Sequence, residues 1–226
     1  MSTELRHGML ARWRRLWIDR AAPDPTMTDE AFERLFMLYT DPARGYHGLD
    51  HIRFCLDEFE TVRHLARHKF ALEAAIWWHD VIYDPKRGDN EQKSMEFAEQ
   101  ELVSFGESPH FIAKVSGNIM ATVHKGGIID TDQQLICDID LAGLGTPDFE
   151  IMRANSRGIR KEYSFYPEAD YVKGRTAILN GFADRDSMYY TPHFRAKYSE
   201  KAKENIRREV AELPELAKFH FPSFAI

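Results

Sequence analysis

Cysteine is scarce in this chain, with only Cys55 and Cys137 among 226 residues. Two isolated thiols make no disulfide framework, and without a CxxC pair they offer no structural zinc site. Long apolar runs are also missing, since no stretch reaches the roughly 18 residues that a membrane span needs. Residues 1 to 20 lack the apolar centre of a signal peptide. We therefore expect a cytoplasmic protein that does not enter a membrane.

The chain has no excess of positive charge. It carries 30 Lys and Arg against 36 Asp and Glu, which gives a formal net charge of −6. This balance argues against a nucleic-acid polymer or an anionic membrane as the main partner. The hydrophobic fraction of 43% is enough for a full core, so the chain is not a disordered protein.

Sustained alternation of apolar and polar residues, the mark of a strand, is absent, while apolar residues recur at helical spacing. We predict an all-α fold, a compact multi-helix bundle that forms a single domain over residues 1–226. The expected helices begin near Thr28, near His51, at Asp89 (through about Val103, with Gln92 in a capping box) and at Ser108 (to near His124). A further helix is expected over residues 71–83, which are apolar nearly all round. Another is expected along the apolar stripe from Phe194 to Leu213.

Two short motifs place polar side chains in apolar surroundings. YHGLDH occupies residues 46–51, and WWHD follows at residues 77–80 inside the apolar run AAIWWHDVIY. Burying His79 beside Asp80 is costly unless something pairs them, and a metal ion is one such partner. Neighbours on a helix point about 100° apart, but their different lengths still let both reach one ion. The alternative is a hydrogen-bonded core histidine, because the dipeptide His-Asp is a weak signal alone.

A third apolar stretch, CDIDLAGLG at residues 137–145, carries two further carboxylates, Asp138 and Asp140. Together with His51, His79 and Asp80, one of them gives two imidazoles and two carboxylates. Such a set can hold one or two divalent ions with water completing the shell. The residue types alone leave the choice between Asp138 and Asp140 open.

The order of these motifs, His then His-Asp then a distant Asp in a helical chain, resembles the HD superfamily of metal-dependent phosphohydrolases. The pieces YHGLDHI, AIWWHDVIYDP, NEQKS, IMATVH and CDIDLAGLG carry the resemblance over about residues 46–144. It implies a divalent cofactor (Mn, Mg, Fe, Co, Ni or Zn) and hydrolysis of a small phosphorylated substrate such as a nucleotide. The ligands it implies are His51, His79, Asp80 and Asp140, the last because the family aspartate stands just before a leucine.

YHGLDH is also similar to the YHNxxH stretch of cyclic-nucleotide phosphodiesterases, whose catalytic domains share the helical core. That similarity implies that His47 donates a proton to the leaving oxygen, while His51 binds metal. Gly48 stands where the phosphodiesterase pattern has asparagine.

Four further residues are candidates around this core. Glu91 could orient a ligand or accept a proton, or it could simply favour the first turn of its helix. His124 could contact phosphate or bind a second ion, or it could stabilise a helix end. Arg160 and Arg175 could clamp a phosphate, because the guanidinium fork matches its oxygens.

Two rival interpretations belong to other functional classes. Some HD-fold proteins are di-iron oxygenases, which need more histidine ligands than the basic four, and His124 keeps that reading open. A non-catalytic regulatory or binding module that keeps the fold is the other. Metal content, oxygen uptake and turnover of phosphate esters distinguish the three.

Overall fold

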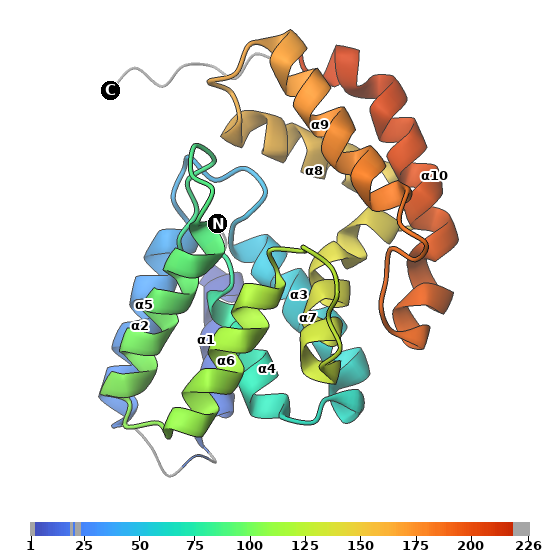
Figure 1. Cartoon of the computed structure of the whole chain (residues 1–226). Helices are drawn as coiled ribbons and strands as arrows, with labels where there is room; N and C mark the ends of the chain where they lie inside the picture. Colours follow the sequence, from blue (N-terminus) through green and yellow to red (C-terminus); the bar gives the residue numbers. More distant parts are fainter. Residues whose placement is uncertain (1–2, 19, 21–23, 219–226) are drawn as a thin grey trace. The chain divides into compact units, whose positions relative to one another are not determined.

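The computed structural model describes residues 3–18, 20 and 24–218, and within them it contains ten α-helices and two short 3-10 helices but no strand (Figure 1). The predicted all-α fold is confirmed. The contacts group the chain into two compact units. The first unit comprises residues 1–41 and 49–137, and the second comprises residues 42–48 and 138–226. A single domain over residues 1–226 stays a prediction.

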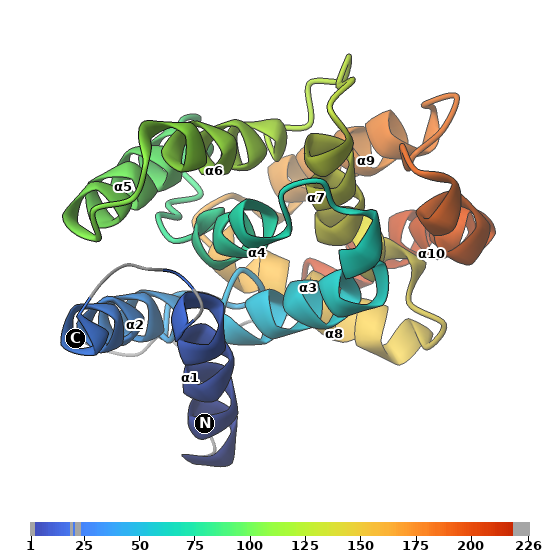
Figure 2. The ribbon, with the colours of Figure 1, turned by 90° about the horizontal axis from the view of Figure 1, so that it is seen from below.

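The first unit is built from six helices and the start of a seventh. They are α1 (Thr3–Ile18), α2 (Pro25–Tyr39), α3 (Leu49–Val62), α4 (Lys69–Trp78), α5 (Asn90–Ser104), α6 (Pro109–Ala121) and the first part of α7 (Thr131–Leu141), with the 3-10 turn η1 (Arg63–Leu65) after α3. α5 and α6 lie side by side, and α6 also packs on α4 (Figure 2).

Helix α4 forms the centre of this unit because it is buried and largely apolar, with the carboxylate of Glu73 paired to Arg63. All its residues from Ala71 to Trp78 are buried. The indole of Trp13 from α1 makes edge-on contacts with Trp77 and Trp78, at 5.3 Å between ring centroids in both cases. Aromatic pairs in this arrangement contribute attraction beyond the burial of their area. The dense apolar packing fixes the C-terminal end of α4, where the His-Asp pair begins.

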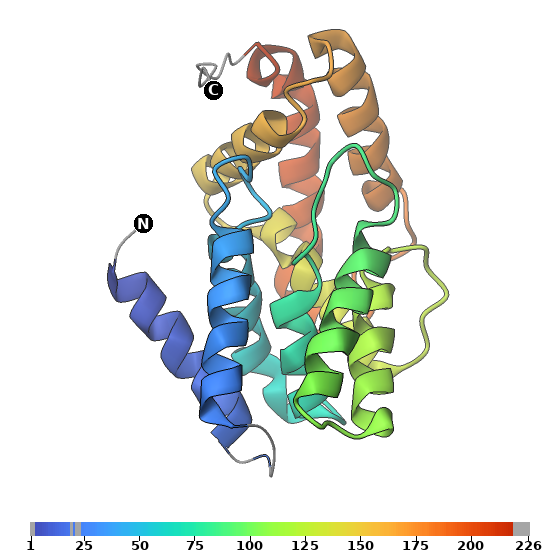
Figure 3. The same cartoon turned by 90° about the vertical axis from the view of Figure 1, so that its left-hand side faces the viewer.

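The second unit holds the loop Pro42–Gly48, the end of α7, η2 (Ala142–Gly145), α8 (Phe149–Glu162), α9 (Glu168–Ala183) and α10 (Pro192–Leu216). α10 is its longest helix and packs on α8, α9 and η2, with α9 running alongside it (Figure 3). Gly145 permits the contact with η2, because a Cβ there would lie 2.6 Å from the ring of Tyr198.

The capping signals predicted some helix starts and missed others. Ser108 caps α6 as expected, since its Oγ accepts from Phe111 N at 3.2 Å and Pro109 follows at the first position. α2 begins earlier than predicted, because Asp24 rather than Thr28 accepts the first amide. The box predicted at Asp89 is wrong, since no side-chain capping bond forms there and its carboxylate instead pairs with Arg87.

Two helices end earlier than their apolar patterns predict. α4 stops at Trp78 rather than near residue 83, because the chain turns at once, with Val81 N donating to Trp78 O at 3.1 Å. His79 is the C-cap, and Asp80 lies in the turn, so the interpretation that both sit inside the helix is wrong. α6 stops at Ala121, and His124 follows with a positive φ of 57°.

Candidate metal centre

Two histidines of the first unit converge from different helices. His51 comes from the first turn of α3 and His79 from the end of α4, and both are buried. His51 Nε2 lies 3.3 Å from His79 Nε2. With the thiol of Cys55, one turn further along α3, they form a group whose potential ligand atoms lie within 4.8 Å of one another. Buried histidine and cysteine side chains in such a group could hold a metal ion.

Asp80 adds a carboxylate to the two imidazoles. Its Oδ2 lies 3.2 Å from His79 Nε2 and 3.6 Å from His51 Nε2. Asp80 lies in the turn after α4, while His79 keeps helical dihedrals of φ −58° and ψ −33°. The carboxylate nevertheless reaches the imidazole of its neighbour, as the 3.2 Å distance shows.

The backbone fixes which nitrogen of His79 faces this group. His79 Nδ1 lies 2.9 Å from the carbonyl oxygen of Ile76, one turn back on α4. A carbonyl only accepts, so Nδ1 carries a proton, and Nε2 is the nitrogen that would bind an ion. Metal-binding histidines commonly have their other ring nitrogen held in this way.

The spacing of these atoms suits a tetrahedral metal ion. Nitrogen ligands about 2.0–2.1 Å from zinc lie about 3.3–3.4 Å apart in that geometry. The separation of His51 Nε2 from His79 Nε2 is 3.3 Å, and the distances from the Asp80 oxygen, 3.2 and 3.6 Å, are close to the same value. The three residues therefore fit a divalent ion of the zinc, iron, cobalt or manganese type.

The structure separates the two aspartates of CDIDLAGLG. Asp138 is fully buried in the second unit and accepts three hydrogen bonds, from Tyr190 N, Thr191 N and Thr191 Oγ1, at 2.7–2.8 Å. Burial raises the pKa of its carboxyl, although these three donors act against the shift. Asp138 therefore orders the turn before α10.

Asp140, two residues further on, belongs to the second unit and is half-buried. It stands on the last turn of α7, which runs unbroken from Thr131, and follows Cys137 by three residues. Its role as the fourth ligand stays a prediction.

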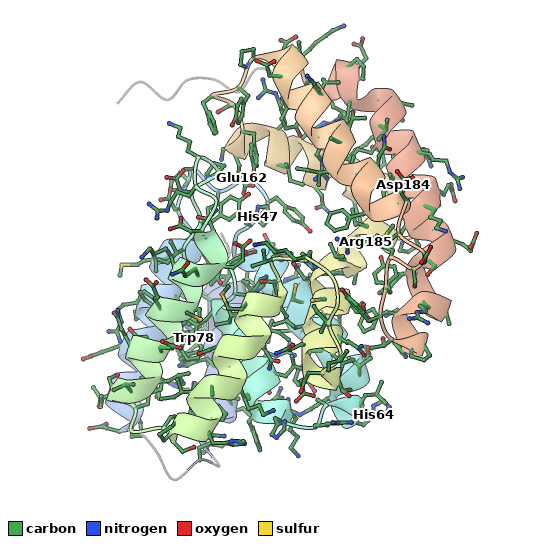
Figure 4. The ribbon with its side chains drawn as sticks, viewed as in Figure 1. His47, His64, Trp78, Glu162, Asp184 and Arg185 are labelled. Atoms are coloured by element: carbon green, nitrogen blue, oxygen red, sulfur yellow. The ribbon has the colours of Figure 1, made fainter. Side chains whose placement is uncertain are left out.

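The second unit contains a buried carboxylate that holds the loop around His47. Glu162, at the end of α8, accepts three backbone amides with Oε1, from Gly45, Tyr46 and His47, at 2.8–2.9 Å. Its Oε2 lies 2.7 Å from His47 Nδ1, and Figure 4 shows the two side chains together. Because the carboxylate is an acceptor, His47 Nδ1 is the donor.

The charge state of Glu162 follows from its neighbours. Burial alone would raise the pKa of this carboxyl, but the hydrogen bond and charge of His47 and the amides of Tyr46 and His47 bring the pKa below its ordinary value. Glu162 is therefore ionised at neutral pH and favours a protonated imidazole beside it.

Two glycines allow the loop to approach α8 so closely. A Cβ on Gly45 would lie 2.1 Å from the carbonyl oxygen of Gly158, and a Cβ on Gly158 would lie 2.4 Å from that of Gly45. Gly158 precedes Glu162 by four residues on α8, so the contact and the carboxylate share one helix face. The backbone, and not only the side chain, fixes His47.

The two arginines predicted to clamp phosphate make internal contacts. Arg160 is buried, and its guanidinium donates to the carbonyl oxygens of Tyr163 at 2.8 Å and Ala217 at 3.1 Å. Arg175 Nε donates to the buried carboxylate of Glu209 at 2.9 Å. These bonds join α8 and α9 to α10, and the phosphate contacts of both arginines stay predictions.

Glu91 and His124 occupy positions that fit either of their predicted roles. Glu91 is half-buried in the first turn of α5, and His124 is half-buried just beyond the end of α6. Their catalytic and substrate-binding roles stay predictions.

Sequence reasoning missed two residues of these clusters. Cys55 could have been found, because it follows His51 by four residues and so shares its helix face. Glu162 lies 115 residues from His47 and has no local motif around it, so only the fold reveals the pairing.

Comparison of the chain with protein-family models, with curated proteins and with solved structures gives no significant match. Within the described residues, no helix is long and apolar enough to cross a membrane. The candidate function therefore depends on the arrangement of the site itself.

Proposed function

We propose that this protein is a divalent-metal-dependent phosphohydrolase acting on a small phosphorylated substrate such as a nucleotide. One observation carries the proposal: His51 Nε2, His79 Nε2 and Asp80 Oδ2 lie 3.2–3.6 Å from one another in a largely buried position. This donor set, in the order His, His-Asp along the chain, is the one that the resemblance to HD phosphohydrolases implies. Asp140 is retained as a further ligand on the sequence resemblance.

The metal ion supplies, when bound, activation of a water molecule near neutral pH and neutralisation of phosphoryl charge. His51, His79 and Asp80 hold and orient it, and the hydrogen bond from His79 Nδ1 to Ile76 O keeps the His79 ring in its binding tautomer. The buried tryptophans at the end of α4 lower the local polarity, which strengthens the electrostatic interactions of the site.

His47 is the proton donor of the proposal. Glu162 binds the Nδ1 side of the ring and stabilises its cationic form, and the cationic ring would donate a proton to the departing oxygen of the ester. Protonation of the leaving oxygen matters most when that oxygen is strongly basic, as in alkyl and sugar phosphates.

The test is a screen of nucleotides, sugar phosphates and p-nitrophenyl phosphate with protein that has been stripped of metal and reloaded with Mn, Zn, Co or Mg. We expect hydrolysis that requires the ion, is abolished by chelator and is lost in His79→Ala. His64→Ala is the matched control, because His64 is an exposed histidine on η1 of the same unit (Figure 4). Metal-bound protein without hydrolysis of any ester would reject the proposal. Oxygen uptake by the iron-loaded protein would instead identify an oxygenase.

A further inference from the structure

Cys55 lies in the candidate metal centre although the HD pattern assigns no role to a cysteine there. It is 1% exposed on α3, one helical turn after His51. Its Sγ lies 3.6 Å from His51 Nε2 and 3.8 Å from His51 Nδ1. The thiol therefore faces the ring that the proposed metal site uses.

Cys55 Sγ and one ligand nitrogen of each histidine lie within 4.8 Å of one another, which is close enough for one ion to reach all three. The sulfur is 3.6 Å from His51 Nε2 and 3.8 Å from His51 Nδ1, so it packs against the ring. Together with His51 and His79, the sulfur gives three donors from the first unit.

The other cysteine provides the contrast. Cys137 is also fully buried in the first unit, but its Sγ donates to the carbonyl oxygen of Ala121 at 3.1 Å. That contact is typical of a buried thiol in a helix interface. Cys55 instead lies beside two imidazoles, which are metal-ligand types.

We propose that the Cys55 thiolate is a ligand of the metal ion in this centre and that it makes the site select zinc, cobalt or iron over magnesium. Thiolates prefer these ions, whereas magnesium prefers oxygen ligands. The S–H bond breaks as the metal–sulfur bond forms, the proton leaves to the buffer, and nothing is oxidised or reduced. The inference rests on the proposed metal site but does not require the substrate to be a phosphate ester.

Cobalt(II) is the probe, because a thiolate ligand gives it an intense near-ultraviolet charge-transfer absorption that nitrogen and oxygen ligands do not give. The metal-free full-length protein is titrated with cobalt, and Cys55→Ala and Cys137→Ala are treated in the same way. We expect the band in the wild type and in Cys137→Ala and its loss in Cys55→Ala. Competition with a chelator should show zinc affinity reduced by about tenfold or more in Cys55→Ala.

Bound cobalt without this band in the wild type would overturn the inference, and that result needs no variant to fold. A band that persists in Cys55→Ala would also overturn it. Cys55→Ser, which keeps the shape of the side chain, repeats the test if the alanine variant does not fold. Cobalt-activated hydrolysis without the band would reject the thiolate ligand and leave the proposed function intact. The charge-transfer band without hydrolysis of any ester would support the thiolate ligand and reject the proposed function.

Discussion

Glu162 Oε2 lies 2.7 Å from His47 Nδ1, although 115 residues separate the two in the sequence. The same carboxylate binds three successive amides of the loop that carries His47. A buried acceptor in this position does two things: it fixes the loop, and it favours the cationic form of the imidazole.

The first prediction concerns proton donation by His47. His47→Ala should keep its metal but lose rate, by about 10² or more on an alkyl phosphate. On p-nitrophenyl phosphate, whose leaving group hardly needs a proton, the loss should be much smaller. Steady-state rates on both substrates, with metal content measured in parallel, test this. Equal losses on both substrates would contradict the acid role, and loss of metal would make His47 a ligand.

Glu162→Gln should weaken the same step without removing it. The amide still accepts the loop amides through its oxygen, but the negative charge that favours protonated His47 is lost. We expect the alkaline limb of the pH–rate profile, which reports the proton donor, to move to lower pH for alkyl phosphates. A profile that keeps its shape while the rate falls at every pH would show that Glu162 is only structural.

The charge of Glu162 also predicts how stability depends on pH. Its folded-state pKa is lowered below the ordinary 4.5, so the unfolded chain binds more protons in acid. Its contribution is complete above about pH 4.5 and is lost as the pH falls through the folded-state pKa. Urea unfolding of the wild type and Glu162→Gln between pH 7 and pH 3 should show a stability difference that shrinks in acid. Glu200→Gln, an exposed site on α10, should show no such trend.

Contact between Gly45 and Gly158 predicts a large penalty for one added methyl group. Gly158→Ala places a Cβ 2.4 Å from the Gly45 carbonyl oxygen, so the backbone itself must move. We expect destabilisation by about 2 kcal/mol or more, as for other overpacked sites. Gly174→Ala on α9 is the control, because nothing lies within 4 Å of a Cβ there. That change should stabilise the protein by about 0.5–1 kcal/mol. Equal effects in denaturant titrations would contradict the close packing.

Replacing Asp138 and Asp140 should have different effects, one on the stability of the fold and the other on metal affinity. Asp138→Ala leaves the amides of Tyr190 and Thr191 without their acceptor, at a cost of about 3 kcal/mol, but should leave metal binding intact. Asp140→Ala should lower metal affinity with little loss of stability. Thermal unfolding together with metal titration of both variants checks the pair. Loss of metal only in Asp138→Ala would reverse the assignment.

The fold class and much of the site could be predicted from local sequence patterns. Helical periodicity gave the all-α fold, and the apolar run around Trp77 and Trp78 marked the buried helix that positions His79. The end of that helix could not be predicted, because it depends on a tertiary contact in which Ile82 N donates to Ser94 Oγ of α5.

The roles of the polar residues in the second unit were the least predictable. The guanidinium of Arg160 matches phosphate oxygens, and in the structure it donates to carbonyl oxygens at the ends of α8 and α10. A sequence pattern identifies residue types that can bind phosphate, but internal acceptors compete for the same donors.

Metal content is the most direct test of the central claim that His51, His79 and Asp80 hold a divalent ion. Elemental analysis should be made on protein purified without chelator and without a nickel column, for the wild type, His79→Ala and the exposed control His64→Ala. We predict about one or two equivalents of a transition metal in the wild type and in His64→Ala, and less than about a tenth of that in His79→Ala. A wild-type protein that is metal-free and cannot be loaded with zinc, manganese, cobalt or iron would contradict the account. The 3.3 Å contact between His51 and His79 would then be a hydrogen bond between two core histidines.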